Sequence, residues 1–289
     1  MHLMAHLPMD ADILPPSDDR IFKTLLTHPD AKPVLMDVVS AAIERPVVDV
    51  QVRNIEPPVM DIDEKYERFD VNCTIDGGVQ VDVEMHSSPT EEIGDTHSGF
   101  INKYIYYLTD LHSSQKSKGV KYRDLVSTYQ VTFCEYTIFP DCADFVSRFS
   151  LRTLGGKQLS EQINMVIVEL SKLNEIASKP VEQLTSFEMW SLFLRFAPDP
   201  RRRILINEII KVKEELGMAS TLLQEISKDE RERAIMRSRR MAETDRVSDL
   251  LTAEARGIAL GETRGMNKVI ELLDQGIPLA EVKKLLESK

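Results

Sequence analysis

Acidic residues and a histidine gather on two short segments that face each other across a glycine turn. The stretch 66–86 reads YERFDVNCTIDGGVQVDVEMH. Apolar and polar residues alternate on both sides of the turn at 76–78, which predicts a hairpin of two half-buried strands. The carboxyl and imidazole groups on the polar face are those of Asp70, Asp82, Glu84 and His86.

The length of the turn decides which of these side chains meet. A two-residue loop at 77–78 would set apolar Val71 against Glu84 and mix the two faces, which disfavours that register. A three-residue loop at 76–78, with a positive φ at its last glycine, keeps the faces separate. In that register Asp70 lies directly opposite Glu84.

Two opposed carboxylates could bind one divalent cation. Directly opposed side chains of an antiparallel pair have Cβ atoms roughly 4.5–5.5 Å apart, which suits two carboxylates that share a metal ion. The same alternation is also expected of a hairpin whose acidic face is simply solvated. Periodicity alone leaves both interpretations open.

Composition limits the class of protein. The chain has 289 residues, 42% of them hydrophobic, and a formal net charge of −11. This charge argues against a protein that coats nucleic acid by bulk electrostatics, although a local basic surface remains compatible with it. No apolar run reaches the ~18–20 residues of a membrane span, and residues 1–16 lack the pattern of a secretory signal. We expect a cytoplasmic protein without a membrane partner.

Strand and helix patterns alternate over the first two thirds of the chain and predict an α/β fold with a mixed sheet. Residues 1–16 show little periodicity and are expected to be a mobile N-terminus. The expected helices are a short one after the N-cap at 17–19, then 33–43 and an aromatic one at 98–112. Besides the hairpin, the expected strands are 47–55, 128–138, 145–151 and 164–170.

The sequence becomes almost continuously helical from Pro180 onward, with a composition shift after 198–200. We therefore expect one domain at 17–199 and a helical C-terminal region at 200–289. The charged stretch 226–246 is typical of a solvated helix face. Glycines recur every fourth residue at Gly257, Gly261 and Gly265, a spacing that permits another helix to approach closely. This region is a candidate for self-association.

Several motifs, in their order along the chain, resemble a known family. They are DDRIFK (18–23), RFDV (68–71), VDVEMH (81–86), KGVKYRDL (118–125) after the aromatic helix, VIVELSK (166–172) and the glycine-spaced tail (257–265). The chain resembles the recombination-promoting nuclease and putative transposase family of the PD-(D/E)XK nuclease superfamily. The resemblance implies a restriction-endonuclease-like fold, a mixed sheet flanked by helices, followed here by the helical C-terminal region.

The resemblance also implies roles for particular residues. Asp70 corresponds to the motif aspartate and Glu84 to the acidic residue of the second half-motif, so both would be metal ligands. The backbone carbonyl of Met85 would be a third ligand. The first helix would contribute Asp19 as an accessory acidic group and Lys23 as a phosphate or DNA contact.

The third motif position departs from the superfamily pattern. The superfamily has lysine there and this family often has glutamine, whereas this chain has His86. A histidine could orient the attacking water or contact the phosphate, and when protonated it could serve as a weaker cation. The implied activity is a DNA endonuclease that depends on Mg²⁺ or Mn²⁺ and is associated with DNA recombination or mobile elements.

Two alternatives remain open from sequence. The protein could be a catalytically degenerate nuclease fold that acts as a DNA- or protein-binding module, as His86 and the net charge suggest. It could also be an interaction protein whose helical C-terminal half carries the function. The expected partners are DNA and a second copy of the chain, and the second copy would bind through the C-terminal helices.

Overall fold

The structure is a computed structural model that describes residues 6–53, 70–87, 96–116, 119–278 and 281–282. The chain divides into two compact units, one ending at Asp229 and one beginning at Glu230. The first unit contains the whole sheet and every residue of the predicted site. Each unit is described by itself below.

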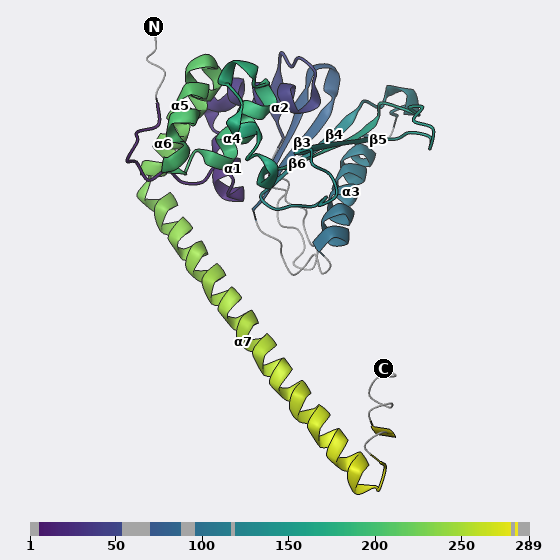
Figure 1. Ribbon diagram of the computed structural model, residues 1–289. Helices are drawn as coiled ribbons and strands as arrows, with labels where there is room; N and C mark the ends of the chain where they lie inside the picture. Colours follow the sequence, from purple (N-terminus) through teal and green to yellow (C-terminus); the bar gives the residue numbers. More distant parts are fainter. Residues whose placement is uncertain (1–5, 54–69, 88–95, 117–118, 279–280, 283–289) are drawn as a thin grey trace. The chain divides into compact units, whose positions relative to one another are not determined.

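A six-stranded mixed sheet forms the centre of the first unit, with strand order β1-β2-β3-β4-β6-β5 (Figure 1). The middle strands β3, β4 and β6 are parallel, whereas β1, β2 and β5 pair antiparallel at the two sides. The sheet confirms the expected fold class. The strands are β1 (Val50–Val52), β2 (Val71–Ile75), β3 (Gln80–His86), β4 (Thr128–Cys134), β5 (Val146–Ser150) and β6 (Ile163–Glu169).

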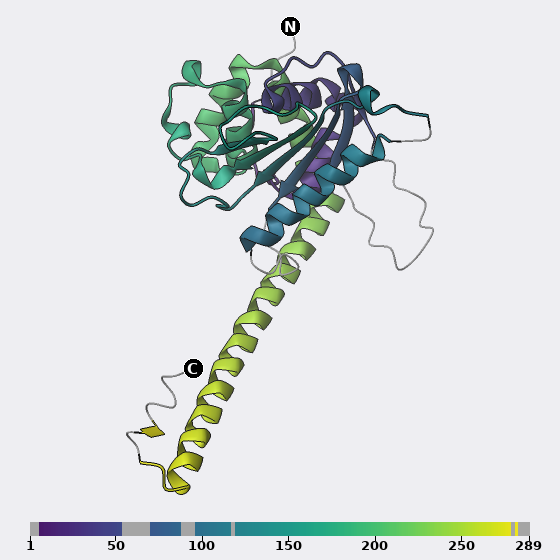
Figure 2. The same cartoon turned by 90° about the vertical axis from the view of Figure 1, so that its right-hand side faces the viewer.

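Helices cover both faces of the sheet, but unequally (Figures 1 and 2). Five helices lie on one side and a single helix, α3 (Thr96–Ser114), packs against β3, β4 and β6 on the other. The central strand β3 is therefore buried on both faces. The five helices are α1 (Asp19–Leu26), α2 (Lys32–Ile43), α4 (Ser186–Phe196), α5 (Arg203–Val212) and α6 (Glu214–Lys228).

Local sequence explains where the helices next to the site begin. Asp18 caps α1, because its carboxylate accepts hydrogen bonds from the backbone N–H groups of Arg20 and Ile21. The apolar side of α1, which includes Phe22, is fully buried and packs towards β3. On the opposite face, the aromatic helix α3 buries Phe100, Tyr104, Leu108 and Leu111, as core side chains rather than exposed rings.

The hairpin register is the one that the three-residue turn predicts. Val71 pairs with Val83, and the Ile75 N–H donates to the Val79 carbonyl at 2.9 Å. The turn residues Gly77 and Gly78 have φ values of 73° and 80°. A side chain at either position would strain the backbone, so the two glycines fix the register that brings Asp70 opposite Glu84.

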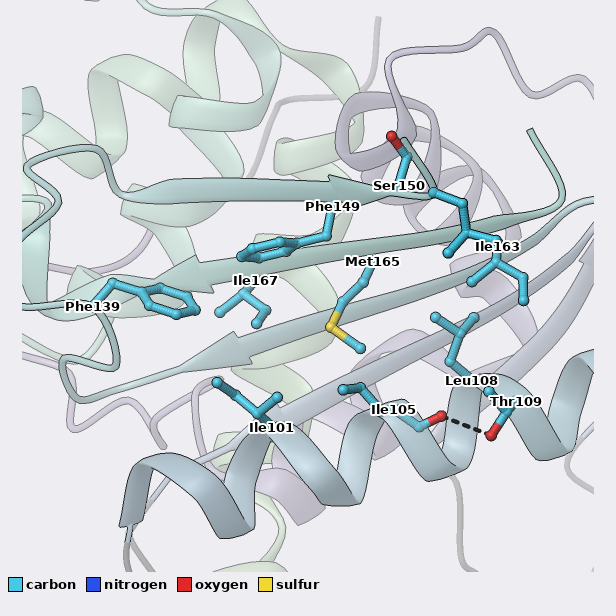
Figure 3. A pocket seen from close by; sticks show the side chains of 11 residues that line it. Ile101, Ile105, Leu108, Thr109, Phe139, Phe149, Ser150, Ile163, Met165 and Ile167 are labelled. Carbon is cyan, nitrogen blue, oxygen red and sulfur yellow. Dashed lines mark hydrogen bonds between the residues drawn. The ribbon is translucent and has the colours of Figure 1, made fainter. Parts of the chain in front are cut away.

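An apolar pocket of about 340 Å³ lies beside α3, over the part of the sheet formed by β5 and β6 (Figure 3). None of the predicted site residues lines it. Its side chains come from α3, from β5 and β6 and from Phe139, and include Ile101, Ile105, Leu108, Phe149, Ile163, Met165 and Ile167. The predicted chemistry therefore lies on the same face of the sheet but outside this pocket.

The structure corrects the expected limits of the globular domain. Residues 6–16 pack on the domain and are not a loose end: Leu7 and Leu14 are buried and donate backbone hydrogen bonds to the side chains of Asn207 and Ser227. Helices α5 and α6 pack against α1, α2 and α4. The boundary expected at 199 thus lies at Asp229, because α5 and α6 bury apolar faces against the helices of this domain.

The second unit consists mainly of one long helix, α7 (Glu230–Asp274), which ends before a left-handed glycine at 276. Most of its large apolar side chains are exposed. They include Met241, Val247, Leu250, Leu251, Ile258, Leu260, Met266, Ile270 and Leu273. Among the described residues, no helix is both long enough and apolar enough to span a membrane.

Candidate nuclease site

Asp70 and Glu84 hold each other in place through the backbone. The Met85 N–H donates to Asp70 Oδ2 at 2.9 Å, and the Asp70 N–H donates to Glu84 Oε1 at 2.8 Å. Asp70 stands directly before β2, and Glu84 lies near the end of β3. The two carboxylates that sequence reasoning placed together are therefore adjacent, each fixed by a backbone donor of the other's segment.

The surroundings of the Asp70 and Glu84 carboxyl groups favour the protonated form of each. The pKa of Asp70 is raised to about 6, mainly by burial and to a smaller extent by the nearby charge of Asp19, while the hydrogen bond from the Met85 N–H works against this rise. Burial also raises the pKa of Glu84 well above its ordinary value, followed by the charges of Asp82 and Asp70. Such mutual repulsion is relieved when a cation or a proton binds between the groups.

Asp82 is the third member of this cluster. Its side chain is completely buried, and burial raises its pKa to about 8. Gln130 is close enough to lower that pKa in part, yet neither Asp82 oxygen has a partner with hydrogen-bond geometry among the described residues. Asp70, Asp82 and Glu84 are called the acidic cluster below. Sequence analysis placed Asp82 on the polar face but gave it no role.

The donor set of the acidic cluster suits a hard divalent cation. Asp82 and Glu84 are buried and Asp70 is half-buried, and neither Asp82 oxygen has a hydrogen-bond partner among the described residues. Ionised carboxylates in such a place are costly unless a cation or proton compensates their charge. Within the described ranges, no three or more His, Cys, Asp or Glu side chains are placed to enclose a metal ion. Mg²⁺ is commonly bound through one or two carboxylates and keeps several waters. Asp70, Glu84 and the Met85 carbonyl fit that mode.

His86 lies at the end of β3 in an aromatic surround. Its ring makes edge contacts with the rings of Phe100, Tyr104 and Tyr136, at centroid distances of 5.6, 6.2 and 5.6 Å. The Tyr136 hydroxyl lies 2.8 Å from His86 Nδ1. Burial, followed by the charge of Lys103, lowers the pKa of His86 to about 4. The imidazole is thus neutral near pH 7 and serves as a hydrogen-bonding group rather than as a cation.

Helix α1 brings its two predicted residues close to Asp70. Burial has the largest effect on the pKa of Asp70. In addition, the charge of Asp19 raises this pKa and the charge of Lys23 lowers it. Both side chains also take part in further interactions within the described residues. The structure therefore places them near the site; whether Lys23 contacts a phosphate stays a prediction.

Helix α3 adds residues that sequence analysis did not assign to the site. The Tyr104 hydroxyl is buried without a partner among the described residues, and burial, followed by the charge of Glu84, raises its pKa. Lys103 holds its ammonium 5.0 Å from the Tyr104 ring centroid and 5.2 Å from that of Tyr107. The only sequence signal was the position of both residues on an aromatic helix, which predicts core packing.

Comparison with known proteins gives one finding. The model of a family described as PD-(D/E)XK nuclease family transposase matches residues 16–253. No curated protein and no solved structure matches the chain. The matched range contains the whole sheet, α3 and the acidic cluster.

Proposed function

Since that match covers most of its length, the chain belongs to the PD-(D/E)XK nuclease family transposases, and from this we propose that it is a metal-dependent DNA endonuclease associated with recombination or mobile elements. The observation that carries the proposal is the pairing of Asp70 with Glu84 through reciprocal backbone hydrogen bonds. Purified full-length protein should nick supercoiled plasmid DNA when Mg²⁺ or Mn²⁺ is present. Absence of nicking with either ion would contradict the proposal.

The residues of the site would divide the work of phosphodiester hydrolysis. A bound divalent ion would lower the pKa of a water molecule and offset charge on the phosphate. Asp70, Glu84 and the Met85 carbonyl would hold that ion at the end of β3. His86, whose ring orientation is fixed by Tyr136, would orient the attacking water by a hydrogen bond. Glu84, Met85 and His86 lie on the buried strand β3, and Asp70 lies directly before β2.

Replacement of His86 should show that a neutral hydrogen-bonding group suffices at this position. We expect His86→Gln to cleave within about tenfold of the wild type, whereas His86→Ala loses ~10²-fold or more, since positioning groups of this kind typically contribute 10²–10⁴-fold. Because the pKa of His86 is about 4, its ionisation should not appear in the pH–rate profile between pH 5 and 8. If His86→Ala cleaved as fast as His86→Gln, His86 would have no role in cleavage.

We further propose that α7 mediates self-association of the protein. A helix that leaves so many large apolar side chains exposed, such as Leu251 and Ile258, gains most of its stability by packing on a partner. The glycines at 257, 261 and 265 leave open space on the helix, which would admit a second helix.

A truncation that ends at Asp229 tests this role better than one at 199, because it keeps α5 and α6. The truncated protein should remain folded and should elute as a monomer, while the full-length chain has a larger mass by light scattering. Its site is complete, so it should still bind Mn²⁺. An unchanged oligomeric state would exclude α7 as the association surface.

A further inference from the structure

The superfamily motif provides a lysine for the phosphate, and this chain has no lysine at that position. Hydrolysis increases the negative charge on the phosphate oxygens in the transition state, and a nearby positive group stabilises it. His86 stands where the superfamily motif has lysine, but it is only 8% exposed and is surrounded by three aromatic rings. Because His86 is enclosed in this way, another side chain must provide the positive charge.

Lys103 on α3 is placed to supply it. The ring of Tyr104 contacts both the Lys103 ammonium and the His86 ring, so that Lys103 lies one aromatic ring away from the motif position. Lys103 is partly exposed, whereas Tyr104 and His86 are buried. Contact with two ring faces positions the ammonium and leaves N–H donors for a phosphate oxygen.

The electrostatics of the site agree with this placement. The charge of Lys103 lowers the pKa of every carboxyl group of the acidic cluster, against the larger effect of burial. It also lowers the pKa of His86, adding to the effect of burial. A partly exposed cation that acts on all four groups is accessible to a DNA phosphate that approaches the site.

We propose that Lys103 is a further catalytic residue of this site, which contacts the scissile phosphate with its ammonium in the role that the superfamily motif gives to lysine. This inference rests on the proposed function. Lys23 on α1 is the competing cation. It already interacts within the described residues, and it acts on Asp70 from the opposite side of the sheet to α3.

The test compares Lys103→Met and Lys103→Arg with a matched control, Lys116→Met. Lys116 also stacks its ammonium on a tyrosine, 4.8 Å from the Tyr122 centroid, but it lies beyond the C-terminal end of α3. With supercoiled plasmid and Mg²⁺, Lys103→Met should lose on the order of 10²–10³-fold in kcat with a much smaller change in KM. Lys103→Arg should recover most of the rate, and Lys116→Met should match the wild type.

Binding of a short DNA duplex without divalent ions gives a second readout. Loss of one phosphate contact should reduce the slope of log K against log salt concentration by about 1 in Lys103→Met but not in Lys116→Met. Cleavage by Lys103→Met at the Lys116→Met rate would overturn the role of Lys103 while the nuclease stands. If the wild type cuts no better than Asp70→Asn, the proposed function fails instead. The salt dependence of DNA binding then still tests Lys103, because an unchanged slope in Lys103→Met would overturn its phosphate contact.

Discussion

Asp70→Asn and Glu84→Gln are each expected to abolish metal-dependent DNA cleavage while leaving the fold intact. Loss of a ligand should remove several kcal/mol of transition-state stabilisation, which corresponds to ~10³-fold or more in rate at 1.36 kcal/mol per tenfold. Asn and Gln keep an oxygen that can accept the hydrogen bonds from Met85 and Asp70. Alanine would leave these backbone donors unsatisfied, so the amides are the sharper variants. Plasmid nicking measures the effect.

Asp110→Asn is the matched control, because Asp110 is an exposed acid on α3, about two helical turns beyond Lys103. It should cleave at the wild-type rate. Thermal melting of all three variants in EDTA checks that each remains folded. If Asp70→Asn and Glu84→Gln cut DNA as fast as Asp110→Asn, the assignment of the metal ligands is wrong, and a nuclease fold that only binds DNA or protein becomes the better hypothesis.

The second large effect concerns pH. The pKa of Asp82 is raised to about 8 by burial, so between pH 4 and 8 this carboxyl binds more protons in the folded protein than in the unfolded chain. Its contribution to the free energy of unfolding falls as pH rises through this window, so that the stability it provides below pH 4 is lost above pH 8. The lowered pKa of His86 opposes this trend only between about pH 4 and 6.5. The loss should be on the order of a few kcal/mol. In EDTA, the melting temperature should be several degrees lower at pH 8.5 than at pH 5.5.

Asp82→Asn should remove most of that pH dependence and stabilise the metal-free protein at pH 8.5. The new amide could donate to Gln130 Oε1, which is unpartnered among the described residues and whose residue pairs with Asp82 across the strands. Adding Mg²⁺ at pH 8.5 should raise the melting temperature of the wild type, since a cation bound to the folded state stabilises it. A melting temperature that rises with pH in EDTA, or a destabilised Asp82→Asn protein, would contradict this account.

Sequence by itself determined the pairing at the centre of the site. Strand periodicity assigns Asp70 and Glu84 to a polar face, and the two glycines of the turn at 76–78 allow only the register that opposes them without mixing faces. Both are local properties of the backbone, since side chains alternate along a strand and the turn length fixes the pairing. The same local signals predicted the helices and strands that build the mixed sheet.

Only the tertiary structure decided what covers that polar face. Alternation tells which side chains share a face, but it does not tell whether water or another element lies above it. Here α3 covers the face, and for this reason Asp82 is buried with no hydrogen-bond partner among the described residues, and His86 is held neutral among aromatic rings. Tertiary packing also brings Lys103 near the acidic cluster and joins α5 and α6 to α1, α2 and α4. These contacts join residues far apart in sequence, and no local pattern specifies them.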